Sequence, residues 1–147
     1  MNVLVANYRQ AQAENYVGLI PRNLKELGLD ASVTIMPDQK IVGDYVEEAS
    51  GTEGSVDVVL MNASRSAVNS DGVSQNPAEI RATISQLVEY GIPVIAETCH
   101  SCPVSPEEVR ALGAESLSEI RYRIDTDPLY ALLLKHHIPK TPDEPKV

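Results

Sequence analysis

The sequence has no Trp and no Phe, and only two of its 147 residues are Cys. Its core must therefore be built from aliphatic side chains, with six Tyr in support. Two cysteines are too few for a disulfide framework in a chain of this size. No apolar run reaches the roughly 18 residues that span a bilayer, and the N-terminus lacks the basic and apolar stretches of a signal peptide. We therefore expect a cytoplasmic protein.

Positive charge is also scarce, since 12 Lys and Arg stand against 21 Asp and Glu, a formal net charge of −9. A negative field repels nucleic-acid phosphates and anionic lipid head groups. We therefore expect neither nucleic acid nor a membrane as a partner. The hydrophobic share of 43% is ordinary for a globular protein, and the length suits one domain.

Apolar runs alternate with amphipathic stretches along the chain. The runs predict strands at 3–6, 31–36, 56–61, 92–96 and 117–124, and the stretches predict helices at 11–27, 41–49, 76–91, 105–112 and 127–137. In the first helix the apolar residues at helical spacing are Val17, Ile20, Leu24 and Leu27, and Pro21 predicts a kink or a break near Gly18. Residues 139–147 carry three prolines and alternating charges. We expect them to form a flexible C-terminal tail after a single domain at 1–138.

This alternation determines the expected fold class. Strands that are joined by helical crossovers run parallel, and the crossovers are right-handed. Five such units predict a doubly wound, five-stranded parallel sheet of flavodoxin-like type, with helices on both faces in three α/β/α layers. In such sheets ligands bind beyond the carboxyl ends of the strands. The residues to examine are therefore those at 7–10, 62–66, 98–102 and 125–127.

Several segments resemble the receiver domain of bacterial response regulators. Met1–Tyr8 is similar to that family's opening strand, which ends in an acidic pair. Asp57–Asn62 is similar to its third strand, which ends in the aspartate that accepts phosphate, and Ile92–Thr98 is similar to its fourth strand. The turns at 69–72 and 111–115 resemble the family's glycine turn and its Leu-Gly-Ala turn. The resemblance covers residues 1 to about 117 and implies a receiver-like fold.

The residues that carry the family's chemistry are replaced in this chain. By the resemblance, the acidic pair that holds Mg²⁺ falls on Asn7 and Tyr8, and the phosphoacceptor falls on Asn62. A neutral amide is a poor nucleophile and a weaker ligand for a hard cation. The expected fifth strand contains no lysine to neutralise a phosphoryl group. Of the family's site residues, only the switch hydroxyl is retained, at Thr98. The resemblance thus implies a degenerate phosphorylation site at Asn7, Tyr8, Asn62 and Thr98, with no metal, no cofactor and no catalytic residue.

Cys99, His100 and Cys102 form the most reactive-looking stretch, because a CxxC motif can support redox exchange or hold a metal. The next helix is predicted to begin at Ser105, so neither thiol occupies the helix N-terminus that activates reactive cysteines. Zinc would need two further ligands. We favour the interpretation that the two cysteines are small residues in a loop. A role in redox exchange or in ligand binding stays open.

Ser64 and Arg65 follow the central strand. The planar guanidinium of Arg65 is suited to holding an anion, although an exposed loop arginine is the commoner situation. These two residues join the candidates for ligand binding.

Two functions remain open. The first is a stand-alone, receiver-like signalling or regulatory module that acts through a protein partner, a second copy of the chain included, without aspartate phosphorylation. The alternative is a small flavodoxin-like enzyme or ligand-binding protein that uses the carboxyl edge of the sheet, with Asn62, Ser64, Arg65, Thr98 and Cys99. A deep cleft with convergent polar groups at that edge would favour the enzyme.

Overall fold

A computed structural model of the chain describes residues 1–6, 10–36, 42–51, 55–63, 77–98, 104–118 and 128–136. Strands and helices alternate along these ranges, as the sequence predicts. Their order is β1 (Asn2–Ala6), α1 (Gln10–Glu26), β2 (Ser32–Met36), α2 (Val42–Ala49), β3 (Val58–Asn62), α3 (Pro77–Glu89), β4 (Val94–Thr98), α4 (Pro106–Ala111), β5 (Glu115–Ser118) and α5 (Pro128–Lys135).

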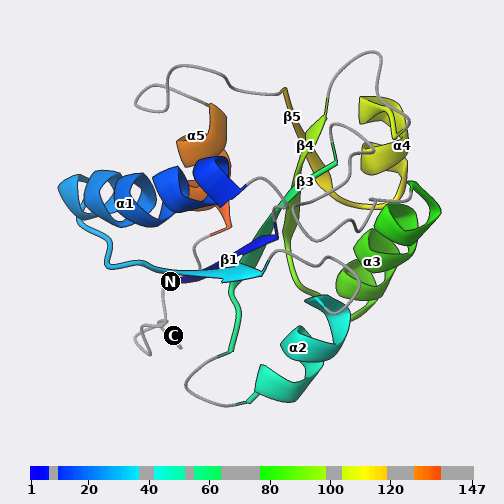
Figure 1. Cartoon of the computed structure of the whole chain (residues 1–147), viewed down its shortest axis with the longest axis horizontal. Helices are drawn as coiled ribbons and strands as arrows, with labels where there is room; N and C mark the ends of the chain where they lie inside the picture. Colours follow the sequence, from blue (N-terminus) through cyan, green and yellow to red (C-terminus); the bar gives the residue numbers. More distant parts are fainter. Residues whose placement is uncertain are drawn as a thin grey trace, which may run out of the picture.

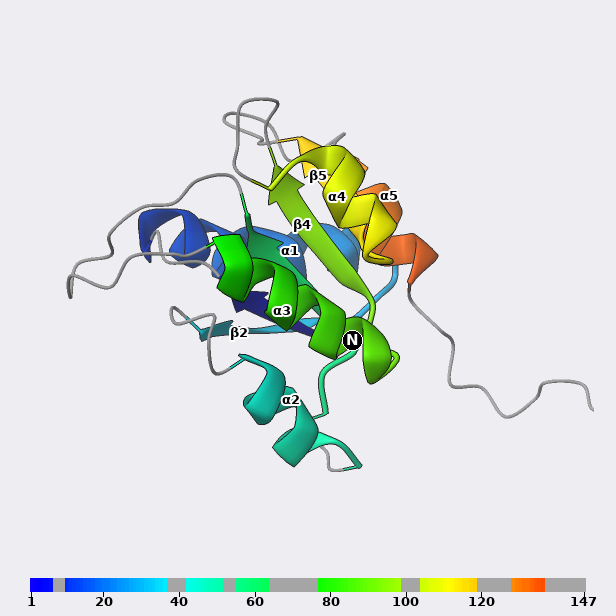
Figure 2. The same cartoon turned by 90° about the vertical axis from the view of Figure 1, so that its right-hand side faces the viewer.

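The strands form one sheet in the order β2-β1-β3-β4-β5. Each neighbouring pair is parallel. The sheet separates α1 and α5 on one face from α2, α3 and α4 on the other (Figure 1), and Figure 2 views it from the side of α3 and α4. This confirms the predicted doubly wound fold with its flavodoxin-like strand order.

Each face of the sheet carries its own hydrophobic cluster. Leu4, Met61 and Ile84 belong to the cluster under α2, α3 and α4. Val5 and Leu60 belong to the cluster under α1 and α5. The central strand β3 is buried along its whole length, because helices cover both of its faces, and this explains its nearly continuous apolar sequence.

Local sequence signals place several element ends correctly. Gly28 follows α1 with a φ of 85°, and the Leu29 amide donates to the Leu24 carbonyl at 2.9 Å, which is the left-handed cap expected for glycine. Ser105 caps α4, with its hydroxyl accepting from the Glu108 amide at 3.2 Å. Gly113, in the Leu-Gly-Ala turn before β5, has a φ of 100°, a conformation that side chains with a Cβ rarely adopt.

The first helix differs from the sequence-based expectation in two ways. It continues past Gly18 without a break, with Pro21 inside it, and Ile20 and Leu24 on either side of the proline are buried; the kink expected there stays a prediction. Its buried side also includes Tyr16, whereas Val17 is 41% exposed. Tyr16 precedes Ile20 by four residues and Val17 precedes it by three. Both spacings place a residue on the same helix face as Ile20, so periodicity alone does not distinguish Tyr16 from Val17.

The predicted strand at 117–124 starts too late. In the structure β5 begins at Glu115 and pairs with β4 through Ile95↔Glu115 and Thr98↔Ser118. Glu115 and Ser116 are polar, so hydrophobicity does not mark them as strand residues; pairing with β4 does. Residues 119–124, like the tail at 139–147, lie outside the described residues.

The described helices include none that is long and apolar enough to cross a membrane.

Candidate functional site at the carboxyl edge of the sheet

The topology places the end of β3 at the switch point of the sheet. β1 is followed by a crossover to β2 on one side, and β3 is followed by a crossover to β4 on the other. In a doubly wound sheet this reversal marks the ligand-binding edge. Ala6 is the last residue of β1 and pairs with Met61 of β3. Asn62, the last residue of β3, therefore extends one residue beyond β1 at this edge.

Asn62 and Thr98 are the predicted site residues that fall within the described ranges. Both lie at the carboxyl ends of their strands, as expected, and they are 0% and 1% exposed. Neither side chain therefore lines an open cleft. The other candidates lie outside the described residues: Asn7, Tyr8, Ser64, Arg65, Cys99, His100 and Cys102.

A buried carboxylate lies beside Asn62, and sequence reasoning did not single it out. Glu97 is the register partner of Asn62, and its backbone carbonyl accepts from the Ala63 amide at 2.9 Å. Its side chain is 0% exposed. Strand alternation places both side chains on the face of α1 and α5, since Leu60 and Ile95, two residues earlier on each strand, pack there.

The hydroxyl of Tyr16 holds this carboxylate. It donates to Glu97 Oε1 at 2.8 Å in a buried hydrogen bond that joins α1 to β4. A buried carboxyl group is costly unless hydrogen bonds compensate its lost hydration. The signal available in the sequence was a single acidic residue at the end of an apolar strand, and the partner on α1 was visible only once that helix had been placed against the sheet.

Thr98 takes part in a second polar contact at this edge. Its Oγ1 lies 2.8 Å from Oγ of Ser116 on β5, and either hydroxyl can donate. Tyr16–Glu97 and Thr98–Ser116 are thus hydrogen-bonded pairs at this edge. Both pairs join elements to one another, so this part of the edge is built to hold α1, β4 and β5 together. Within the described ranges, no three His, Cys, Asp or Glu side chains gather where they could hold a metal ion.

Two ion pairs tie neighbouring elements together around this framework. Arg81 on α3 donates to both carboxylate oxygens of Glu108 on α4, at 2.6 and 3.2 Å. This hydrogen bond is the main reason why the pKa of Glu108 lies below its ordinary value. Lys135 donates to Glu115 Oε2 at 2.6 Å, and His136 lies 3.1 Å from the same oxygen. The hydrogen bond from Lys135 is the main cause, and the contact with His136 a smaller one, of the pKa of Glu115 lying below its ordinary value.

These two lowered pKa values predict acid sensitivity. A carboxylate whose pKa is lower in the folded state contributes stability above its unfolded pKa, and loses it as the pH falls through the folded pKa. We expect the melting temperature to fall as the pH is lowered from about 7 to about 3, with the Glu115→Gln and Glu108→Gln variants less sensitive than the parent chain. Calorimetry across this pH range measures it.

Glu107→Gln is the matched control, because Glu107 has a side chain 76% exposed and only a 3.7 Å pair with Arg110. Its pH profile should match the parent chain, since such exposed pairs contribute little. Equal profiles for all three glutamine variants would show that neither Glu108 nor Glu115 causes the acid sensitivity.

Comparisons with known proteins bear on this architecture. No protein-family model and no curated protein matches the sequence. Solved structures do match. A response regulator receiver protein from Burkholderia phymatum superposes with a TM-score of 0.58 at 17% identity, covering 92% of this chain and 93% of that one. An orphan response regulator of H. pylori gives 0.57 at 17% identity, covering 92% and 95%. The Vibrio cholerae chemotaxis protein CheY4 gives 0.56 at 15% identity, covering 90% and 96%.

These matches span nearly the whole of each receiver structure, and they agree with the observed strand order and with the segments in which the sequence resembles receivers. The chain therefore has the fold of a response-regulator receiver domain.

Proposed function

We propose that this chain is a receiver-like signalling or regulatory module that acts through contact with a protein partner and without phosphorylation of an aspartate. The observation that carries the proposal is Asn62. It occupies the end of β3 at the switch point, where the resemblance places the phosphoacceptor, and its side chain is a buried neutral amide. An amide lacks the anionic oxygen that attacks phosphorus.

The carboxylate of Glu97 does not replace the missing acceptor. It lies one strand away, it faces the interior under α1, and the Tyr16 hydroxyl occupies one of its oxygens. With its side chain fully buried, Glu97 is not open to a phosphoryl donor. We therefore assign Glu97 to holding α1 against the carboxyl edge, and we propose no specific Mg²⁺ binding there.

The partner in this proposal is a protein, and a second copy of the chain is one candidate. We propose no interaction with nucleic acid, in keeping with the net charge of −9, and we place the module in the cytoplasm. Sedimentation equilibrium of the purified chain tests the second copy directly. The alternative of an enzyme at the carboxyl edge receives no support from Asn62 and Thr98, because both are buried.

Phosphorylation is the direct test. Acetyl phosphate is expected to leave the chain unmodified, and the Asn62→Asp variant should show slow or undetectable labelling. Restoring the acceptor alone does not supply an anchored metal or a cation to neutralise the phosphoryl group, and phosphoryl transfer depends on both. Intact mass before and after hydroxylamine, which cleaves acyl phosphates, gives the readout.

A receiver domain that keeps its aspartate, treated in parallel, shows that the reagent is active. Stoichiometric labelling of the parent chain at any residue of the carboxyl edge would contradict the proposal and favour the enzyme. Efficient labelling of Asn62→Asp alone would show that the site lacks only its acceptor.

A further inference from the structure

The strand at one edge of the sheet is paired on one side. β2 stands first in the order β2-β1-β3-β4-β5, and within the described ranges it pairs with β1 alone. The register runs without interruption from Ser32 to Met36, so no bulge turns this edge away. Proteins usually protect an open edge with charges, prolines or bulges, because its unpaired backbone groups accept another strand. β2 itself, Ser-Val-Thr-Ile-Met, contains none of these devices.

The backbone groups that face outward belong to Val33 and Ile35. The Ser32 amide donates to the Met1 carbonyl at 2.9 Å, so the backbone groups of Ser32 face β1. Successive residues of a strand direct these groups to opposite sides. Thr34 therefore faces β1 as well, and the N–H and C=O groups of Val33 and Ile35 face away from it. No strand in the described part of the chain pairs with them.

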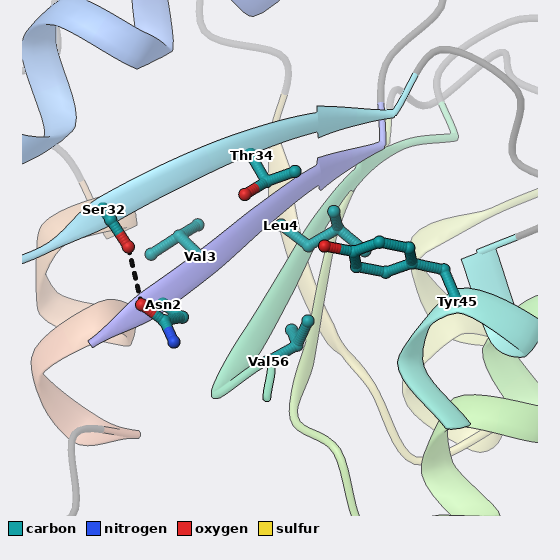
Figure 3. A pocket seen from close by; sticks show the side chains of 7 residues that line it. All are labelled: Asn2, Val3, Leu4, Ser32, Thr34, Tyr45 and Val56. Carbon is teal, nitrogen blue, oxygen red and sulfur yellow. Dashed lines mark hydrogen bonds between the residues drawn. The ribbon is translucent and has the colours of Figure 1, made fainter. Parts of the chain in front are cut away.

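The side chains of β2 alternate between the two faces of the sheet. Val33 and Ile35 are half-buried against the hydrophobic cluster under α1 and α5. Thr34 is exposed on the other face, which it shares with Leu4, its register partner on β1 (Figure 3). The edge thus presents two β-branched apolar side chains on one face and a hydroxyl on the other.

Charge determines where two copies of this chain can meet. With a formal net charge of −9, the copies repel one another over much of their surface. On α2, for example, Asp44, Glu47 and Glu48 face no basic residue of the same helix. Every described helix, and β5 at the other edge, carries at least one charged side chain, whereas β2 carries none. A second copy therefore meets the least repulsion at β2.

The strand is also complementary to itself. In an antiparallel pair, two opposite residues whose backbone groups face each other exchange both hydrogen bonds. A two-fold axis at Thr34 places Val33 opposite Ile35 of the second copy, so that every outward group of both residues is used. An axis at Val33 or Ile35 would leave the other residue without a partner inside the strand. With the axis at Thr34, the two threonines meet in the closer, non-hydrogen-bonded position, where such pairs are favourable.

We propose that the chain forms a two-fold symmetric dimer in which the β2 strands of two copies pair antiparallel, centred on Thr34. The interface is isologous, since the same residues of both copies form it. This inference rests on the proposed function, contact with a protein partner, and names both the partner and the surface.

A cysteine cross-link tests the register. Thr34→Cys, in a chain whose Cys99 and Cys102 are replaced by serine, brings two thiols together across the axis, because opposite Cβ atoms lie about 4.5–5.5 Å apart there. Mild oxidation should convert most of this variant to a covalent dimer. Ser85→Cys in the same background is the control, since Ser85 is exposed on α3 and should stay monomeric. Equal cross-linking of the two variants would overturn the proposed register.

Sedimentation equilibrium of the full chain tests the association itself. The parent chain should dimerise, and Thr34→Lys should weaken the dimer about 5- to 20-fold, because it places two like charges opposite each other and removes the threonine pair. Ser85→Lys changes the net charge equally but away from β2, so its effect should be smaller. The inference fails if the parent chain is monomeric at millimolar concentration, or if the two lysine variants dimerise equally. Circular dichroism melting confirms that each variant is folded.

The two proposals fail in different ways. A monomeric parent chain that acetyl phosphate leaves unmodified would refute the β2 dimer and leave the proposed function with another protein as the partner. A dimer that loses its association in Thr34→Lys, yet is labelled at the carboxyl edge, would uphold the dimer and refute the proposed function.

Discussion

Replacing Leu60 by alanine is expected to lower the free energy of unfolding by about 2–5 kcal/mol. Leu60 lies in the middle of β3, between β1 and β4, and its side chain is fully buried in the cluster under α1 and α5. Alanine would leave a cavity that close-packed neighbours cannot fill. Since a domain of this size has a total stability of roughly 5–15 kcal/mol, the loss would be a large part of it. Urea unfolding followed by circular dichroism measures the change.

Leu134→Ala on α5 is the matched control. Leu134 is 41% exposed, and exposed substitutions usually change stability by no more than about 0.5 kcal/mol. The two variants remove the same atoms from the interior and from the surface. Similar losses in both would show that β3 is not the packed centre of the domain.

Replacing Tyr16 by phenylalanine is expected to cost about 1–3 kcal/mol, because it removes a hydroxyl that donates to a buried carboxyl group. The ring remains, so packing of α1 on the sheet is retained. The hydroxyl donates to Glu97 at 2.8 Å, and both residues are buried. A double-mutant cycle with Glu97→Gln separates the coupling of the two side chains from their individual effects.

The comparison for this variant is Tyr90→Phe. The Tyr90 hydroxyl accepts only a 3.3 Å hydrogen bond from Gln86 on the exposed side of α3, so its removal should cost little. If Tyr16→Phe is no more destabilising than Tyr90→Phe, the contact with Glu97 does not hold α1 to the carboxyl edge. A coupling energy near zero in the cycle would lead to the same conclusion.

The Tyr16–Glu97 contact also changes how the carboxyl edge is understood. By the resemblance, Asn62 stands where a receiver has its phosphoacceptor carboxylate. A carboxyl group is nevertheless present on the neighbouring strand, at Glu97, which is in register with Asn62 and faces α1. A carboxylate at the surface of this edge would be available to a metal ion and could attack a phosphoryl donor. The buried and hydrogen-bonded carboxyl group of Glu97 instead stabilises a single arrangement of α1 and β4. This is consistent with the proposed module, which acts through contacts with a protein partner.

The order of elements was determined by the sequence itself. Hydrophobic periodicity and cap residues such as Gly28 and Ser105 act over a few neighbouring residues, so they can be read without the fold. The parallel sheet followed, because a helix between two strands leaves little choice of direction. The position of Asn62 at the switch point followed in turn from the strand order that such sheets adopt.

Only the tertiary structure decided the features that depend on contacts between distant segments. It chose Tyr16 over Val17 as the buried residue of α1, because both have helical spacing but only the tyrosine hydroxyl reaches Glu97, 81 residues along the chain. It extended β5 to the polar Glu115, because pairing with β4 and not hydrophobicity makes that residue part of a strand. It also brought α2 close to α3, where Gly43 leaves room for the side chain of Gln86. Each outcome depends on packing between elements that are distant in the sequence, and local sequence patterns cannot predict such packing.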